Sequence, residues 1–295
     1  MSQMLRGAFT AIVTPFRDDG ALDEPALWSF VEWQLSEGIN GLVPVGSTGE
    51  AVTLSLAERE QVVRIVVERA AGRVPVIAGA GSNDTAAAIA ASKALAAAGA
   101  THLLHVSPMY NKPPQRGLLA HFRAIADASP VPIVLYNVPG RTASNMLAET
   151  TLALAEHANI VAVKEASGNP TQIDQILRAR PAGFGVLSGD DGLTLAVMMA
   201  GGEGVVSVIS NVVPKACAEF CAAIARGDLA TAREAHHRLA PLVDAAFAES
   251  NPIPVKAALA RMGRMKNILR LPLVPMDPKH QLSLEAALRA AGVTL

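Results

Sequence analysis

The chain has 295 residues, of which 51% are apolar and 17% charged, and its formal net charge is −1. This composition supplies a large core and excludes a disordered or strongly basic protein, so we expect no nucleic-acid partner and no binding to an acidic membrane surface. The first residues lack a signal-peptide pattern and no apolar run is long enough to span a bilayer, so we expect a cytoplasmic protein.

Short apolar runs alternate with longer amphipathic segments through most of the chain. We expect eight strands, at Ala8–Val13, Gly41–Val45, Val74–Ala78, Thr101–Val106, Pro132–Tyr136, Ile160–Lys164, Gly185–Leu187 and Gly204–Val208. We expect helices between and after them at Glu24–Glu37, Leu56–Ala71, Thr85–Ala98, Gln115–Ala128, Leu147–His157, Gln172–Arg178, Asp191–Met199 and Pro214–Ala225. Strands this apolar are covered on both faces, so the repeat predicts an α/β fold, a (β/α)8 TIM barrel. No GxGxxG loop follows a strand, which disfavours an open dinucleotide-binding sheet.

The pattern changes after about residue 226. Helical segments separated by proline-rich turns follow, at Asp228–Phe247, Pro254–Met262 and Ser283–Ala291. We therefore expect a barrel domain of residues 1–225 and a C-terminal helical domain of residues 226–295 packed on it. The two cysteines, Cys217 and Cys221, are four residues apart in a helical segment, which predicts reduced thiols on one helix face.

Lys164 stands at the end of the apolar run that begins at Ile160, directly before Glu165. An ammonium group is costly to remove from water unless it is paired or loses its proton, and a neutral amine attacks carbonyl carbons. One interpretation is therefore a lysine that forms a Schiff base. The other is a lysine that reaches solvent or pairs with Glu165. This segment alone favours neither interpretation.

Other polar residues also follow predicted strands, where the active site of a TIM barrel lies. The only two tyrosines, Tyr110 and Tyr136, both fall at strand ends, and a phenol can donate and accept a proton. The alternative is that they cap strands as core residues. The segment GSTGE, residues 46–50, offers hydroxyls and backbone N–H groups suited to a carboxylate or phosphate, although a structural turn has the same pattern.

Three further candidate residues carry charge. Arg141 lies in a turn that proline and glycine hold rigid, which favours bidentate binding of a carboxylate over a solvated surface position. Asp190 and Asp191 lack histidine neighbours, so we expect them to cap the next helix and expect no metal site. Together, these residues indicate a lyase in which a lysine condenses with a 2-keto acid and the resulting enamine attacks an aldehyde. This chemistry requires no cofactor.

The chain resembles the dihydrodipicolinate synthase / N-acetylneuraminate lyase family of pyruvate-dependent aldolases. The resemblance runs over essentially the whole chain in GSTGE, SPMYNKP, YNVPGRT, VKEASGN, SGDD, GGEGVVSVISN and ESNPIPVKAAL. YNVPGRT and ESNPIPVK resemble the dihydrodipicolinate synthase branch in particular. The resemblance implies a homotetramer, built as a dimer of tight dimers. It also implies condensation of pyruvate with L-aspartate 4-semialdehyde to 4-hydroxy-tetrahydrodipicolinate, in lysine and diaminopimelate biosynthesis.

The resemblance also implies roles for four catalytic residues. Lys164 would form the imine with pyruvate, and Tyr136 would be the acid–base group above it. The hydroxyl of Ser47 would link Tyr136 to Tyr110, which in this family reaches into the site of the neighbouring subunit.

The same resemblance implies binding roles for Ser47 and for four further residues. Backbone N–H groups of Ser47 and Thr48 would hold the pyruvate carboxylate, Gly189 and Val206 would line the pyruvate pocket, and Arg141 would bind the semialdehyde carboxylate. Synthases usually carry threonine in place of Ser47, and serine is common in lyases of sialic acid and 2-keto-3-deoxy sugar acids, which leaves such an aldehyde as the alternative. Those lyases generally lack the arginine, so Arg141 favours the semialdehyde. A non-catalytic barrel that binds a keto acid is the rival from another class.

Regulation by lysine is a further expectation. Lysine-inhibited family members hold the effector at the dimer interface with a glutamate, histidines and a tyrosine. The matching positions here carry Ala87, Leu56, Arg59 and Met109, and only Asn83 is retained. Because the acidic partner for an ammonium group is missing, we expect weak or no inhibition by lysine.

Overall fold

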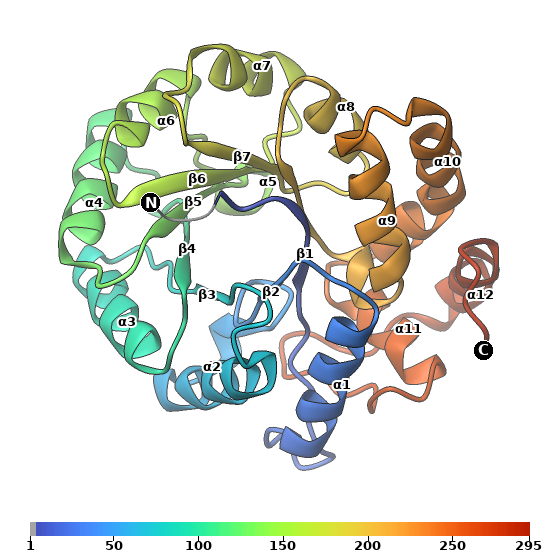
Figure 1. The fold of residues 1–295 in the computed structure, drawn as a ribbon. Coiled ribbons are helices and arrows are strands. Elements are labelled where there is room, and N and C mark those ends of the chain that lie inside the picture. The colour runs from blue at the N-terminus through green and yellow to red at the C-terminus, as the bar shows by residue number, and fades with distance from the viewer. Residues whose placement is uncertain (1–3) are drawn as a thin grey trace.

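A computed structural model describes residues 4–295, in which eight parallel strands form a barrel (Figure 1). The strands are β1 (Gly7–Ala11), β2 (Gly41–Val43), β3 (Ile77–Gly79), β4 (His102–Val106), β5 (Ile133–Asn137), β6 (Ile160–Glu165), β7 (Gly185–Ser188) and β8 (Gly204–Ser207). Their order is β2-β1-β8-β7-β6-β5-β4-β3, and a parallel bridge between Leu42 and Val76 closes the ring. The predicted TIM barrel is confirmed, since each strand overlaps a predicted one.

Helices surround the barrel in the predicted alternation with the strands. They are α1 (Glu24–Ser36), α2 (Leu56–Ala70), α3 (Thr85–Ala97), α4 (Gln115–Ala128), α6 (Ala148–Ala155), α7 (Pro170–Ala179), α8 (Thr194–Met199) and α9 (Pro214–Ala225). Local sequence fixes several of their starts. For example, Ser55 and Glu58 form a reciprocal capping box at α2, and the Asp84 side chain accepts hydrogen bonds from backbone N–H groups at the start of α3.

The segment around Arg141 differs from the prediction, because it forms a short helix, α5 (Pro139–Thr142), instead of a turn. Proline fits the first helical position, since its fixed φ is helical and no N–H is needed there. Ala143 then ends the helix in the left-handed conformation, and its N–H donates to the Pro139 carbonyl. Arg141 is consequently presented by a single helical turn directly after β5.

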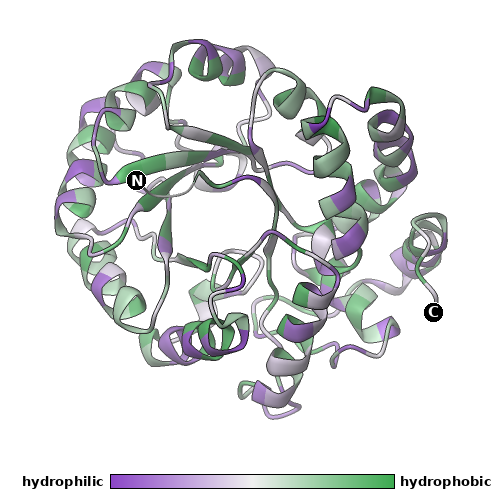
Figure 2. Ribbon diagram, viewed as in Figure 1, coloured by the Kyte–Doolittle hydropathy of each residue, from purple (hydrophilic) through white to green (hydrophobic). Residues whose placement is uncertain are grey.

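Strand side chains alternate between the barrel interior and the layer between strands and helices. The interior holds one apolar cluster, which includes Phe9, Leu104 and Tyr136, and the outer layer holds a larger one. Figure 2 shows mostly hydrophobic strands, whereas the surrounding helices mix hydrophobic and hydrophilic residues. This alternation matters for the site, because it decides which residues at the strand ends face inward.

Three helices follow the last strand–helix pair, namely α10 (Leu229–Ala246), α11 (Ile253–Arg261) and α12 (Gln281–Ala290). They pack against one another on one side of the barrel, and α10 also packs against α9 (Figure 1). The division into domains 1–225 and 226–295 stays a prediction. Cys217 and Cys221 on α9 form no disulfide, as predicted, and both are buried. None of the helices in residues 4–295 has the length and apolar character needed to cross a membrane.

Candidate active site

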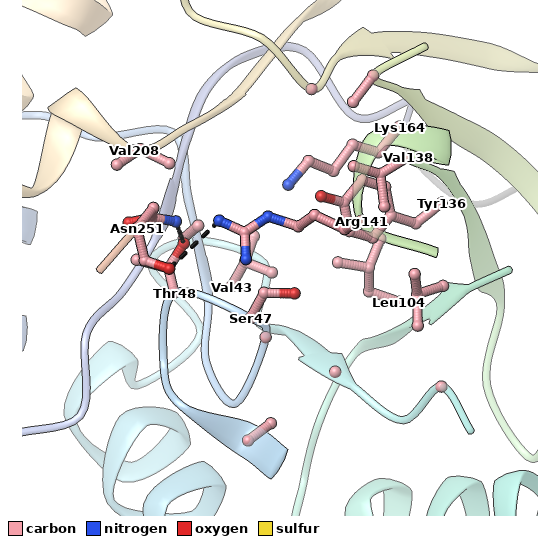
Figure 3. A pocket seen from close by; sticks show the side chains of 18 of the residues that line it. Val43, Ser47, Thr48, Leu104, Tyr136, Val138, Arg141, Lys164, Val208 and Asn251 are labelled. Carbon is pink, nitrogen blue, oxygen red and sulfur yellow. Dashed lines mark hydrogen bonds between the residues drawn. The ribbon is translucent and has the colours of Figure 1, made fainter. Parts of the chain in front are cut away.

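A cavity of about 280 Å³ opens at the C-terminal ends of the strands. Its walls come from strands around the barrel and from the C-terminal region, which contributes Phe247 and Asn251. Figure 3 shows Lys164, Tyr136, Arg141, Ser47 and Thr48 arranged around it. The position agrees with the expectation that chemistry in a TIM barrel lies at the strand ends.

Lys164 faces the barrel interior from β6. It lies in register with Tyr136 of β5 and Leu187 of β7, and only 6% of its surface is exposed. Its Nζ atom lies 4.1 Å from the centroid of the Tyr136 ring. Within residues 4–295 this Nζ atom has no hydrogen-bond acceptor and no carboxylate partner. A buried amine without a counterion, at the wall of a cavity, is placed to attack a carbonyl carbon.

Glu165 points to the other side of β6, as alternation along a strand requires. Its carboxylate accepts hydrogen bonds from Asn137 Nδ2 at 3.1 and 3.2 Å, from the Ser167 N–H at 2.8 Å and from Gln172 Nε2 at 3.3 Å. Burial raises the pKa of the Glu165 carboxyl above its ordinary value, against the effect of these donors. The interpretation in which Lys164 pairs with Glu165, or reaches solvent, is therefore wrong.

The GSTGE segment forms a turn after β2 that opens onto the cavity. Ser47 is exposed, Thr48 is buried, and both line the cavity. The turn is held by the N–H of Glu50, which donates to the Ser47 carbonyl at 3.1 Å. Among residues 4–295, the backbone N–H groups of Ser47 and Thr48 donate to no acceptor. These groups are therefore available to an anionic ligand.

Arg141 is linked to the same turn through a C-terminal residue. Its Nη2 donates to the Asn251 carbonyl at 3.2 Å, and Asn251 Nδ2 donates to Thr48 Oγ1 at 2.8 Å (Figure 3). The guanidinium group keeps further N–H donors for a carboxylate at the cavity. Sequence reasoning missed Asn251, because 203 residues separate it from Thr48. The only signal was its place in the family-like motif ESNPIPVK.

Gly189 lines the cavity and lies directly against Lys164. A Cβ atom added there would lie 3.0 Å from Cε of Lys164 and 2.6 Å from Cβ of Ala166. Val206 is placed differently, since it is buried in the interior cluster of the barrel and Val208 lines the cavity instead. The structure thus brings Gly189 to the lysine and leaves Val206 beneath the cavity.

Tyr110, unlike the other three predicted catalytic residues, does not line the cavity of its own chain. It is 89% exposed, has a φ angle of +71°, and does not line the cavity, although Met109 next to it does. The phenol of Tyr110 is therefore exposed at the surface of the chain and forms no part of the cavity wall.

The two aspartates after β7 do not cap α8, so this prediction is wrong. The residue at the N-cap is Leu193, and no side chain caps the helix. Asp191 instead accepts hydrogen bonds from the N–H groups of Val208 at 2.8 Å and Ile209 at 3.3 Å, which ties the β7 end to the β8 end. Among residues 4–295, no group of three or more histidine, cysteine or acidic side chains is placed to hold a metal ion.

Known proteins match this chain over nearly its full length. The Dihydrodipicolinate synthetase family model matches residues 4–291. A 4-hydroxy-tetrahydrodipicolinate synthase from Maridesulfovibrio salexigens is 49% identical, covering 98% of this chain and 99% of the relative. The chloride-inhibited dihydrodipicolinate synthase from Acinetobacter baumannii, solved with pyruvate, has a TM-score of 0.96 at 42% identity, covering 98% and 100%. A structure described as the first monomeric dihydrodipicolinate synthase variant has a TM-score of 0.97 at 44% identity, covering 99% and 98%.

Proposed function

The chain belongs to the dihydrodipicolinate synthetase family, and we propose that its cavity condenses pyruvate with L-aspartate 4-semialdehyde through an imine on Lys164. It is a lyase of lysine and diaminopimelate biosynthesis, and its product is 4-hydroxy-tetrahydrodipicolinate. The observation that carries the proposal is the buried, unpaired amine of Lys164 under the Tyr136 ring at the cavity wall. The test is trapping of that imine by borohydride after incubation with pyruvate.

The first half of the reaction builds a carbon nucleophile. Lys164 Nζ attacks C2 of pyruvate, and loss of water gives the imine, while the free N–H groups of Ser47 and Thr48 hold the carboxylate. The protonated imine withdraws electrons from the adjacent methyl group. Transfer of one methyl proton to a base then gives the enamine. Tyr136 is the group in our proposal that moves these protons, because its ring contacts the lysine nitrogen.

The second half joins the two substrates and releases the enzyme. The enamine carbon attacks the aldehyde carbon, and the new alkoxide takes a proton to become the 4-hydroxyl group. The amino group of the semialdehyde then attacks C2, the bond from C2 to Lys164 Nζ breaks, and the ring closes as a cyclic imine. One water molecule is released overall. The imine itself accepts the electrons, so the proposed steps use no other cofactor.

Arg141→Ala is expected to discriminate between the possible aldehydes. We expect the KM for aspartate semialdehyde to rise roughly 10- to 100-fold, because charge-assisted hydrogen bonds to a carboxylate are lost, while the KM for pyruvate changes little. Steady-state kinetics with each substrate varied in turn measure both constants. Arg141→Lys, which keeps the charge but not the fork of donors, should fall between the two. Equal increases in both KM values would contradict the assignment.

A sugar-acid aldehyde is the alternative that Ser47 suggested. A relative that is 49% identical over 98% of this chain carries the synthase name, and Asn251 holds Arg141 at the cavity. Both observations favour the semialdehyde over a sugar-acid aldehyde. The serine keeps the hydroxyl that the proton relay to Tyr110 needs. The non-catalytic alternative is disfavoured, because Lys164, Tyr136 and Ser47 all line one cavity.

Lysine insensitivity is also part of the proposal. Arg59 and Met109, at two of the positions that hold lysine in inhibited family members, line the cavity here, and neither supplies a negative charge. An ammonium ligand therefore lacks its main electrostatic contact. We expect steady-state rates to stay near their uninhibited values at sub-millimolar lysine, and clear inhibition in that range would contradict this.

The assembly we propose is a cytoplasmic homotetramer made of two tight dimers. The exposed phenol of Tyr110 supports it, because in this family that residue reaches the neighbouring subunit's site. The monomeric variant among the solved structures is the counterexample to exclude. A molar mass of one chain in solution, together with full activity, would contradict the proposed assembly.

A further inference from the structure

Glu50 occupies an unusual position at the end of the GSTGE turn. Its backbone has a φ angle of +55°, in the left-handed region that a non-glycine residue rarely adopts. Its N–H donates to the Ser47 carbonyl, and its own carbonyl accepts the N–H and the hydroxyl of Thr53, both at 3.0 Å. The backbone of Glu50 therefore anchors the turn that carries the N–H groups of Ser47 and Thr48.

The Glu50 side chain is completely buried and is held by the C-terminal region. One carboxylate oxygen accepts from Lys256 Nζ of α11 at 2.5 Å, and the other accepts from the Arg270 N–H at 3.0 Å. The side chains of Glu50 and Lys256 have no exposed surface. An ion pair this deep persists only when its remaining hydrogen-bonding groups are also satisfied.

The Lys256 ammonium group also has partners besides Glu50. Its Nζ also donates to the Ile268 carbonyl at 2.6 Å and lies 4.3 Å from the centroid of the Phe16 ring. Arg270 covers the same ring at 4.5 Å and donates to the Thr53 carbonyl at 2.8 Å. Burial lowers the pKa of the Lys256 ammonium, and the attraction of Glu50 opposes this effect. Apart from the Lys256–Ile268 contact, these interactions join residues 16–53 to residues 256–270.

We propose that Glu50 and Lys256 are positioning residues that set the geometry of the pyruvate carboxylate site from the C-terminal region. Neither residue lines the cavity, so neither touches substrate. They act through the turn, because a rotation of Glu50 moves the Ser47 carbonyl to which it is bonded, and with it the two available N–H groups. This inference rests on the proposed function, since it assumes that these N–H groups hold pyruvate.

A positioning role differs from a general structural role in what it changes. Donors that hold the carboxylate in the ground state and the transition state alike affect KM and leave kcat nearly unchanged. A pair that only stabilises the fold would lower the melting temperature and leave the pyruvate concentration at half-saturation where it was. The two roles are therefore separated by a binding measurement on folded protein.

The experiment compares Lys256→Met, Glu50→Gln and the double variant with the wild type. Lys256→Met keeps the length of the side chain, and the double variant leaves no unpaired buried charge, so it retains the fold even if a single variant does not. We measure borohydride-trapped adduct against pyruvate concentration by intact-protein mass spectrometry, together with steady-state kinetics and melting curves. The matched control is Arg261→Met, which breaks an ion pair between Arg261 of α11 and Glu285 of α12.

We expect the half-saturating pyruvate concentration and the pyruvate KM to rise about tenfold or more in each single variant, with kcat at saturation changed by less than about threefold. The double variant should match the singles instead of multiplying their effects, because both act through one contact. Arg261→Met should match the wild type in both constants.

Two results would overturn the inference. One is an unshifted half-saturation in any folded variant of the pair. The other is failure of all three variants to fold while Arg261→Met folds, because the pair would then be a folding element. A wild-type protein that forms no adduct at any pyruvate concentration would instead contradict the proposed function itself.

Discussion

Lys164→Ala is expected to form no borohydride-stable adduct with pyruvate and to lose roughly four orders of magnitude or more of condensation activity. The reason is that the imine is both the covalent link to pyruvate and the electron sink for the enamine, so no other group in the cavity substitutes for it. Intact-protein mass spectrometry after pyruvate and borohydride, followed by peptide mapping, measures the adduct and its position. Lys164→Arg should behave alike, since a guanidinium keeps the charge without the nucleophile.

The matched control for this prediction is Lys215→Ala. Lys215 lies exposed on α9 and does not line the cavity, so its removal should leave adduct and rate unchanged. An adduct of undiminished yield on folded Lys164→Ala would place the nucleophile elsewhere. A folded wild type without adduct would overturn the imine mechanism and favour a barrel whose lysine is structural.

The barrel and its lysine could be predicted because both depend on short-range pattern. Eight apolar runs in alternation with helices are enough to indicate the fold, and the strand ends then follow from it. The choice between a nucleophilic Lys164 and one paired with Glu165 needed one more step, namely alternation along β6. With Lys164 facing the interior beside Tyr136, Glu165 has to face the helices, where Asn137 and Gln172 hold it.

Contacts between distant segments could not be predicted in this way. Lys256 and Glu50 are 206 residues apart, and nothing in the local sequence of either indicates a fully buried pair. The same is true of Asn251, which joins Arg141 to Thr48. Such contacts depend on how the C-terminal helices dock on the barrel, which is a property of tertiary packing and not of periodicity.

The residue types after β7 led to a wrong prediction of a helix cap. Aspartate is favoured at helix N-caps, yet Asp191 accepts from two N–H groups at the end of β8, because unpaired donors buried there are costlier than an uncapped short helix. Tyr110 shows a different limit. Its position after β4 was predicted, but nothing in the local sequence indicates how exposed its side chain is.

Tyr136→Phe is expected to lower kcat by roughly 10²- to 10³-fold, because we propose that the phenol moves protons in imine formation and in the aldol step. The substitution isolates the hydroxyl. Phenylalanine keeps the ring that packs 4.1 Å from Lys164 Nζ and keeps its place in the interior cluster, so fold and lysine position should be preserved. The pyruvate adduct should therefore still form at equilibrium, although more slowly.

The measurement that separates these effects is the rate of adduct formation alongside steady-state kcat. A slow approach to a full adduct yield, with an unchanged melting temperature, assigns the loss to proton transfer. Tyr110→Phe is the informative comparison, because it removes the second phenol of the proposed relay without altering the cavity wall of its own chain. If Tyr136→Phe kept kcat within about threefold of the wild type, the hydroxyl would not be the acid–base group, since a positioned side chain in that role contributes far more. Its ring would then serve only to exclude water from Lys164.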